Sequence, residues 1–143
     1  MSPETALYNF FNTRALAAVS PSPLAGLSVL PTDYSHKTDF CLVIGNCNSV
    51  FSPGPGGETK EYNGRILLQI LKKVSDDVES AEYVEAREKV RHASLEVAGL
   101  LFDFSTLDGN VCDVQVEDGF RDYAEVKGNY YAIAIIPVIV NPL

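Results

Sequence analysis

The stretch EYNGRILLQILKK, residues 61–73, decides the fold class of this chain. Its side chains alternate between two faces, as they do in a β-strand. One face carries Ile66, Leu68 and Ile70, and the other carries Leu67, Gln69 and Leu71. We therefore expect one long strand. Near its start, Asn63-Gly64 is compatible with a tight turn or with a bulge in a single strand.

Helical patterns flank this strand on both sides. After it, Ser80 is a suitable N-cap for a helix that runs to about residue 102. Before it, Ser2 and Pro3 are typical of the start of a helix that ends near residue 19. The stripes expected to face a core are Val90, Ser94, Val97, Leu101 and Phe104 in the later helix, and Leu7, Phe11, Ala15 and Ala18 in the earlier one.

Three further segments favour strands. Residues 39–45 form a short apolar run, residues 111–117 alternate with Cys112, Val114 and Val116 inward, and residues 129–140 form a long terminal strand. Residues 122–128 are compatible with a loop or the start of a strand. Because Pro137 lacks a backbone donor, the terminal strand is expected at a sheet edge or with a bulge.

The expected order is α-β-β-α-β-β within one domain, residues 1–143. We predict an α+β fold in which two helices pack on one face of a four-stranded, mainly antiparallel sheet. Between the first two strands, residues 46–60 contain two prolines and three glycines within five residues. Such a composition does not suit a regular element, so an extended loop is predicted.

Two segments carry more apolar surface than an isolated domain needs, and they are the candidate contact sites. The loop candidates are Val50, Phe51, Pro53, Gly54, Pro55, Gly56, Gly57 and Lys60, and the strand candidates are Tyr131, Ile133, Ile135 and Pro137. A long apolar edge strand is an aggregation hazard unless it pairs or is buried. Assembly by strand addition or against a neighbouring subunit would satisfy both segments.

Charge and composition exclude several classes of function. The net charge is −8, from 11 basic and 19 acidic residues, which disfavours tight binding to DNA but suits a surface that DNA must pass without sticking. The longest apolar run, residues 132–140, is about half of the roughly 20 residues that a membrane helix needs. We expect no membrane span and no secretory signal.

The search for chemistry is mostly negative. No phosphate-binding or nucleophile-elbow motif is present, and Cys41, Cys47 and Cys112 with two histidines barely supply a zinc site. Cys47 and His92 could form a nucleophile pair, but a solvated helix histidine is the stronger interpretation. We therefore predict no catalytic site, no metal and no cofactor.

Taken together, these segments resemble the tail-terminator (tail-completion) proteins of long-tailed bacteriophages. The resemblance covers nearly the whole chain, in its length and element order. It rests on residues 6–19 as the first helix, FCLVI (40–44) and GRILLQIL (64–71) as the first strands, residues 80–102 as the long helix, and YYAIAIIPVIVN (130–141) as the closing strand.

That resemblance implies a ring, usually of about six copies, at the head-proximal end of the tail tube. The ring would stop tube polymerisation and join the tail to the head, with DNA passing through it without specific binding. The implied partners are further copies of the chain, the tube protein and a head–tail connector or head-completion protein. The loop at 46–60 would reach a neighbour or the tube. The implied location is the neck region of the virion, assembled in the host cytoplasm.

Two alternatives stay open. The long linker at 20–38 and the Pro/Gly loop depart from shorter family members, so a head-completion or other tail-junction subunit is one alternative. The other is a small ligand-binding or enzymatic α+β domain that uses Cys47 or the glycine-rich loop. Solution mass and choice of partner distinguish the three.

Overall fold

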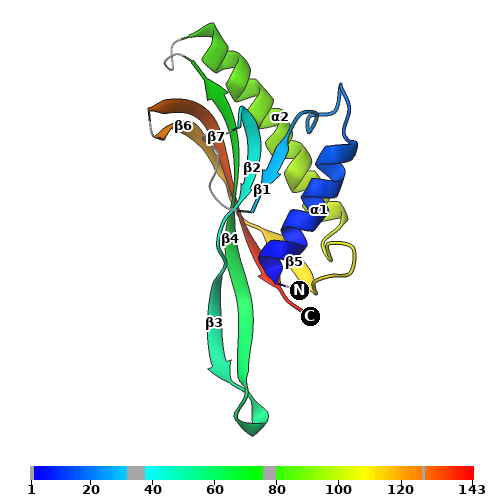
Figure 1. Ribbon diagram of the computed structural model, residues 1–143. Helices are drawn as coiled ribbons and strands as arrows, with labels where there is room; N and C mark the ends of the chain where they lie inside the picture. Colours follow the sequence, from blue (N-terminus) through cyan, green and yellow to red (C-terminus); the bar gives the residue numbers. More distant parts are fainter. Residues whose placement is uncertain (1, 32–37, 76–79, 127) are drawn as a thin grey trace.

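The computed structural model describes residues 2–31, 38–75, 80–126 and 128–143 and shows an α+β fold (Figure 1). Two long helices lie on the same side of one twisted sheet, and a hairpin extends away from the body. The elements in chain order are α1 (Pro3–Ala17), β1 (Ser28–Leu30), β2 (Phe40–Ile44), β3 (Asn48–Pro53), the short 3₁₀ helix η2 (Pro55–Gly57), β4 (Thr59–Val74), α2 (Ala81–Asp103), β5 (Asp113–Val116), β6 (Phe120–Val126) and β7 (Asn129–Asn141).

The sheet is built around β4 and β7, which pair antiparallel from Gly64↔Val140 to Val74↔Tyr130. Seven strands take part, in the order β1-β2-β4-β7-β5, with β3 also on β4 and β6 also on β7. Among the described strands, β1 alone breaks the antiparallel pattern, because it runs parallel to β2. The predicted α+β class and the placement of both helices on one face are confirmed. The predicted number of strands, four, and the predicted order α-β-β-α-β-β are wrong in detail.

Bulges explain most of the extra strands. Between Ile44↔Leu68 and Asn48↔Arg65, residues 45–47 lie opposite residues 66 and 67, so β2 and β3 follow one edge of β4 as an interrupted strand. Between Val116↔Val138 and Phe120↔Ile135, residues 117–119 lie opposite residues 136 and 137, and β5 and β6 follow β7 in the same way. Each three-against-two mismatch is a β-bulge. Residues 122–128, for which the sequence allows a loop or a strand, belong mostly to β6.

Of the two alternatives expected for the terminal strand, the edge position is wrong, but a bulge does lie opposite Pro137. β7 lies between β4 on one side and β5 with β6 on the other. Pro137 is tolerated there because its carbonyl accepts from the Glu117 N–H at 2.9 Å on the β5/β6 side. The nitrogen of a strand residue faces the same neighbour as its carbonyl. The missing donor of Pro137 therefore falls at the bulge of residues 117–119, where regular pairing is interrupted anyway.

The main core lies between the helices and one face of the sheet. Leu7 and Phe11 of α1 and Val90, Val97 and Leu101 of α2 are at most 1% exposed, as predicted from their spacing. They meet the sheet side chains Leu42, Ile44, Ile66, Leu68, Ile70, Val138 and Val140. The alternation predicted for residues 61–73 is confirmed, because its helix-facing set is fully buried.

Phe104 departs from the predicted helix stripe. It follows the last residue of α2 and is 43% exposed. Its ring lies 6.1 Å from that of Phe10, and the Arg14 guanidinium stands 4.9 Å from its centroid. Phe104 therefore joins the two helix ends at the surface. Ser94 is half-buried, and Cys112, predicted to point inward, is exposed.

A smaller cluster occupies the opposite face of the sheet, which we call the outer face. Its buried members are Cys41, Val43, Leu71, Tyr131 and Ile133. The sheet therefore buries apolar side chains on both faces near β2 and the start of β7. Towards the other end of β4 and β7, the outer face is more open.

The start of α2 gives a direct test of the capping argument. The Ser80 side chain accepts a hydrogen bond from the Tyr83 N–H at 3.0 Å, satisfying one of the free donors of the first turn. Ser80→Ala is expected to lower the free energy of unfolding by about 1 kcal/mol. Urea denaturation of the variant and the parent measures this, with Ser80→Asp as the control that keeps an acceptor. An alanine variant as stable as the parent would contradict the cap.

Candidate functional site

The predicted loop at residues 46–60 is instead a hairpin arm, formed by β3, η2 and the start of β4. Residues 50–53 of β3 pair antiparallel with residues 59–62 of β4, from Val50↔Tyr62 to Pro53↔Thr59. The pairing of β4 with β7 ends at Gly64, so beyond that point the arm has two strands and leaves the body (Figure 1). The loop prediction is wrong because the prolines and glycines are confined to the tip.

The tip of the arm is a turn closed by backbone hydrogen bonds. The Gly54 N–H donates to the Glu58 carbonyl at 2.6 Å, and the Gly57 N–H donates to the Gly54 carbonyl at 3.3 Å. Gly56 and Gly57 have φ of 83° and 85°, a left-handed conformation that residues with a Cβ adopt at a cost. Glycine is therefore needed at the tip to close the turn.

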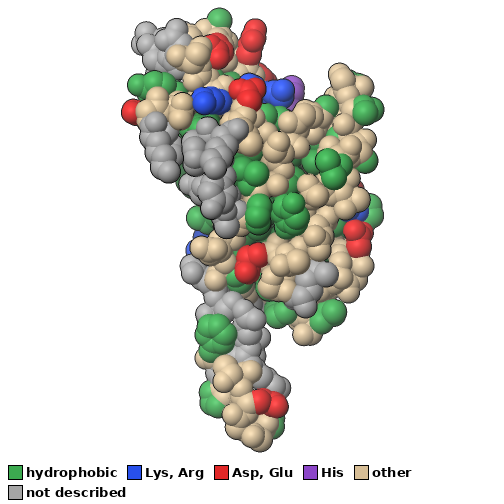
Figure 2. Space-filling view, in the orientation of Figure 1, with side chains coloured by type: hydrophobic (Ala, Val, Ile, Leu, Met, Phe, Trp, Pro, Cys, Tyr) green, Lys and Arg blue, Asp and Glu red, His purple; other side chains and the backbone are tan. Residues whose placement is uncertain are grey.

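The arm exposes an aromatic residue and both prolines. Phe51 is 67% exposed, and Pro53 and Pro55 are exposed as well. The space-filling view shows apolar side chains on the arm, away from the body (Figure 2). For Val50 and Lys60, two other predicted contact residues, the structure describes the backbone pairing but not the side chains. The arm thus carries Phe51, Pro53, Gly54, Pro55, Gly56 and Gly57 together, as the sequence suggested.

A second feature, the outer-face groove, lies where the arm joins the sheet. Its volume is about 540 Å³, and it is lined by Gly45, Asn46, Arg65, Leu67, Gln69, Asp118, Phe120, Ile135 and Pro137. Strand pairing aligns its apolar members, because Leu67 is opposite Pro137 and Phe120 is opposite Ile135. Leu67 is 39% and Phe120 57% exposed. The groove therefore offers apolar side chains to a partner.

Charge surrounds this apolar strip. The Arg65 Nε lies 3.1 Å from Glu117 Oε1, so an ion pair links β4 to the bulge between β5 and β6. Asp118 follows in the same bulge and lines the groove. On the opposite side, Gly45 is close to β4, where a Cβ would lie 2.8 Å from the Leu67 carbonyl oxygen. The groove is therefore walled by two bulges and has an apolar floor with a polar rim.

The four strand candidates of the sequence analysis separate into two groups. Tyr131 and Ile133 are 0% and 9% exposed, inside the smaller cluster of the same chain. Ile135 and Pro137 line the groove. Sequence reasoning missed Phe120 because it stands beside a polar segment, although an aromatic residue after Gly119 is a visible signal. It placed Leu67 on the second face of its strand without assigning it to a site.

The structure does not present the suggested nucleophile pair. Cys47 lies in the bulge between β2 and β3 and packs against the main core. His92 is on the exposed side of α2, with its Nε2 3.9 Å from Glu88 Oε2. Within the described residues, no group of three or more His, Cys, Asp or Glu side chains is arranged to hold a metal ion. No helix in the same residues is long and apolar enough to cross a membrane.

The sequence matches no protein-family model, and no curated protein is significantly similar to it. The hairpin arm and the outer-face groove are therefore the features of the molecule that indicate a function.

Proposed function

We propose that this chain is a structural subunit that forms a ring at the head-proximal end of a phage tail tube. In this role it ends tube polymerisation and joins the tail to the head connector. The observation that carries the proposal is the hairpin arm, which projects from the body with Phe51 exposed. The resemblance of the chain to tail-terminator proteins supplies the identity of the assembly.

The arm is poorly supported by its own chain. A two-stranded hairpin is marginally stable alone in water, and its outer edges present unpaired backbone groups. With about 3.3 Å per residue, the six residues of β3 span roughly 20 Å. An arm of that reach gains contacts and stability when it lies on another molecule. Assembly therefore gives the arm a physical role that an isolated domain would not.

The outer-face groove is a suitable receptor for such an arm. It presents Leu67, Phe120 and Ile135 to an apolar side chain, and it lies on a different part of the chain from the arm tip. When the arm of each copy lies in the groove of the next copy, the contact is heterologous, and it closes into a ring when the rotation between copies allows. The arm and groove are therefore compatible with a ring, and the resemblance to tail terminators favours the ring over a dimer that exchanges arms.

The other proposed partners follow from this placement in the virion neck. Arms or ring faces not used between copies would meet the tube protein on one side and the connector or head-completion protein on the other. The net charge of −8 suits a channel through which DNA passes without specific binding. A head-completion or other tail-junction subunit would use the same arm, so partner identity separates that alternative.

The test is a shortened arm. Replacing residues 51–61 with Asn-Gly leaves Val50 and Tyr62 flanking a two-residue turn of the type that hairpins favour. Strands β1, β2, β5, β6 and β7 and both core clusters lie outside this segment. We expect the variant to keep the parental melting temperature but to lose ring formation, measured by light scattering alone and with purified tube protein.

A matched control keeps Phe51 and removes only the tip. In it, Asn-Gly replaces residues 53–59, so that Ser52 and Lys60 flank the turn. Tube length by electron microscopy, with parent, control and shortened protein, provides the functional readout. If the shortened protein still formed rings and still ended tubes at the parental length, the arm would not be the assembly element and the proposal would fail.

A further inference from the structure

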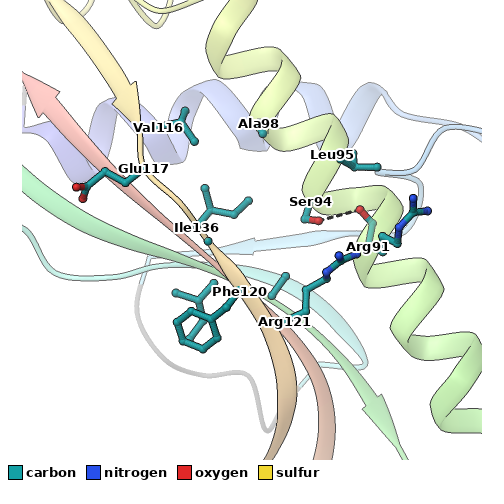
Figure 3. Close-up of a pocket in the computed structure, with 12 residues that line it drawn as sticks. Arg91, Ser94, Leu95, Ala98, Val116, Glu117, Phe120, Arg121 and Ile136 are labelled. Atoms are coloured by element: carbon teal, nitrogen blue, oxygen red, sulfur yellow. Dashed lines mark hydrogen bonds between the residues drawn. The ribbon is translucent and has the colours of Figure 1, made fainter.

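A second cleft, on the helix side of the sheet, shares Phe120 and Ile135 with the outer-face groove, and its other lining residues lie outside that groove. It lies between α2 and strands β5, β6 and β7 and has a volume of about 290 Å³ (Figure 3). Its lining residues are Arg91, Ser94, Leu95, Ala98, Val116, Glu117, Gly119, Phe120, Arg121, Ala134, Ile135 and Ile136. The cleft is thus bounded by one helix face and by the interrupted strand.

One wall is a second stripe of α2. Arg91, Ser94, Leu95 and Ala98 are spaced i, i+3, i+4 and i+7, so they share one face of the helix. This face differs from the stripe that enters the core through Val90, Val97 and Leu101. Leu95 is 60% exposed. The Ser94 hydroxyl donates to the Arg91 carbonyl at 2.8 Å, which uses its proton within the helix.

The floor is apolar and already desolvated. Ala134 is 2% and Ile136 6% exposed, and Val116 stands at one end of the cleft (Figure 3). An apolar side chain that enters here completes contacts with a rigid strand of the central sheet. Burial of apolar area is favourable in proportion to that area. Because Ala134 and Ile136 are already buried, most of the apolar area that a ligand can cover belongs to Leu95 and Phe120, which are 60% and 57% exposed.

The other end of the cleft is positive. Arg91 reaches it from α2, and Arg121 extends from β6 towards the helix (Figure 3). Arg91 forms a salt bridge with Glu88, one turn away in α2, but the 3.8 Å between Nη1 and Oε2 is beyond hydrogen-bond length. Within the part of the chain that the structure describes, no salt bridge involves Arg121. Glu117, the acidic residue of the lining, is paired with Arg65.

Two arginines at one end of an apolar cleft stand out on a chain with a net charge of −8. Because both line the same cleft, a carboxylate bound there would be attracted by two positive charges. The planar guanidinium also offers paired donors that match a carboxylate. Charge and shape are therefore complementary to a ligand that has an acidic group close to an apolar one.

We propose that this cleft binds an acidic peptide segment of a partner protein. In the complex, an apolar side chain of the segment packs on Leu95 and Phe120, and its carboxylates meet Arg91 and Arg121. Nucleic acid fits less well, because a duplex brings a long row of phosphates to a surface that is otherwise acidic. Arg91 and Arg121 line this cleft and not the outer-face groove, whereas Phe120 and Ile135 border both.

The experiment selects ligands from random sequences, so the partner protein does not have to be identified first. A displayed library of random 12-residue peptides is panned against the full chain and, in parallel, against the double variant Arg91→Gln/Arg121→Gln. We expect peptides from the parent to combine Asp or Glu with a large apolar residue. The best peptide, labelled with a fluorophore, should bind the double variant about tenfold or more weakly by anisotropy, the scale of hydrogen bonds between charged groups.

Arg87→Gln is the control for the loss of an arginine, because it removes one positive charge from an exposed position of α2 outside the cleft. It should bind the peptide as the parent does, and all variants should keep the parental melting temperature and oligomeric mass. Equal binding by the double variant, peptides without acidic residues, or displacement of the peptide by a short DNA duplex would each overturn the proposal. Because the oligomeric mass is measured separately, a failure of the peptide-binding proposal is distinguishable from a failure of the ring proposal.

Discussion

Gly119→Ala is expected to lower the free energy of unfolding by about 3 kcal/mol, at the upper end of the cost of overpacking. A Cβ at this position would lie 2.4 Å from the Ile135 carbonyl oxygen and 3.5 Å from the Ile136 Cα. Both atoms belong to the backbone of β7, the inner strand, which is held by β4 on its other side. Neither neighbour can rotate away, so the bulge itself must shift.

Urea denaturation of parent and variant measures this loss. Gly99→Ala is the matched control, because a Cβ at Gly99 meets nothing within 4 Å and the residue lies inside α2. Alanine there should raise stability by about 0.5–1 kcal/mol, the usual gain over glycine within a helix. A Gly119→Ala variant as stable as the parent would show that the bulge of residues 117–119 is not pressed against β7.

The bulge at Gly119 also shapes both candidate binding sites. Gly119 and Phe120 line the helix-side cleft, and Asp118 and Phe120 line the outer-face groove. A shift of the bulge would therefore change both surfaces at once. Gly119→Ala is a test of the fold for this reason and is unsuitable as a test of either site alone.

The strand β4 and the starts of both helices could be predicted from the sequence, because each is marked by residues that are close together in the chain. Alternation in residues 61–73 indicated both faces of β4, and Ser80 and Ser2 indicated the starts of the two helices. Each of these signals acts within a few residues of the chain. A cap bonds a nearby N–H, and a strand's two faces follow from backbone geometry alone.

Strand pairing was harder to predict because it depends on residues distant in sequence. β3 forms because its backbone pairs with residues 59–65, although its segment is rich in turn residues. The bulges at 45–47 and 117–119 appear only when the register against β4 and β7 is known. β1 has three residues and is held by its parallel pairing with β2, which no local pattern signals.

The candidate sites follow the same division. Phe51 and the Pro/Gly tip were identified from composition, because an apolar residue beside a turn is visible in sequence. The outer-face groove was not, since Leu67, Phe120 and Pro137 meet only through the pairing of three strands. Pro137 predicted an edge position or a bulge for β7, and only the register against β5 and β6 shows that the bulge is the correct alternative.

Leu68→Asp is expected to abolish the cooperative fold. Leu68 is 0% exposed in the main core, between its partners Ile44 and Ile136. Truncating such a leucine costs about 2–5 kcal/mol, and a buried unpaired carboxylate adds several more. Because small domains have only about 5–15 kcal/mol of stability, little would remain. Circular dichroism during heating should show no cooperative transition, and Leu68→Ala should give a reduced but measurable one.

The neighbouring residue supplies the matched control and a test of the groove. Leu67 is 39% exposed and points to the outer face, so Leu67→Asp should change stability by less than about 1 kcal/mol. If the groove receives the arm of another copy, the same variant should remain folded yet lose the ring mass, as the shortened arm does. Combining Leu67→Asp with the shortened arm should then reduce the ring mass no further, because both changes remove the same contact between copies. A folded Leu67→Asp variant that still forms rings would leave the arm as an assembly element but assign its receptor to another surface.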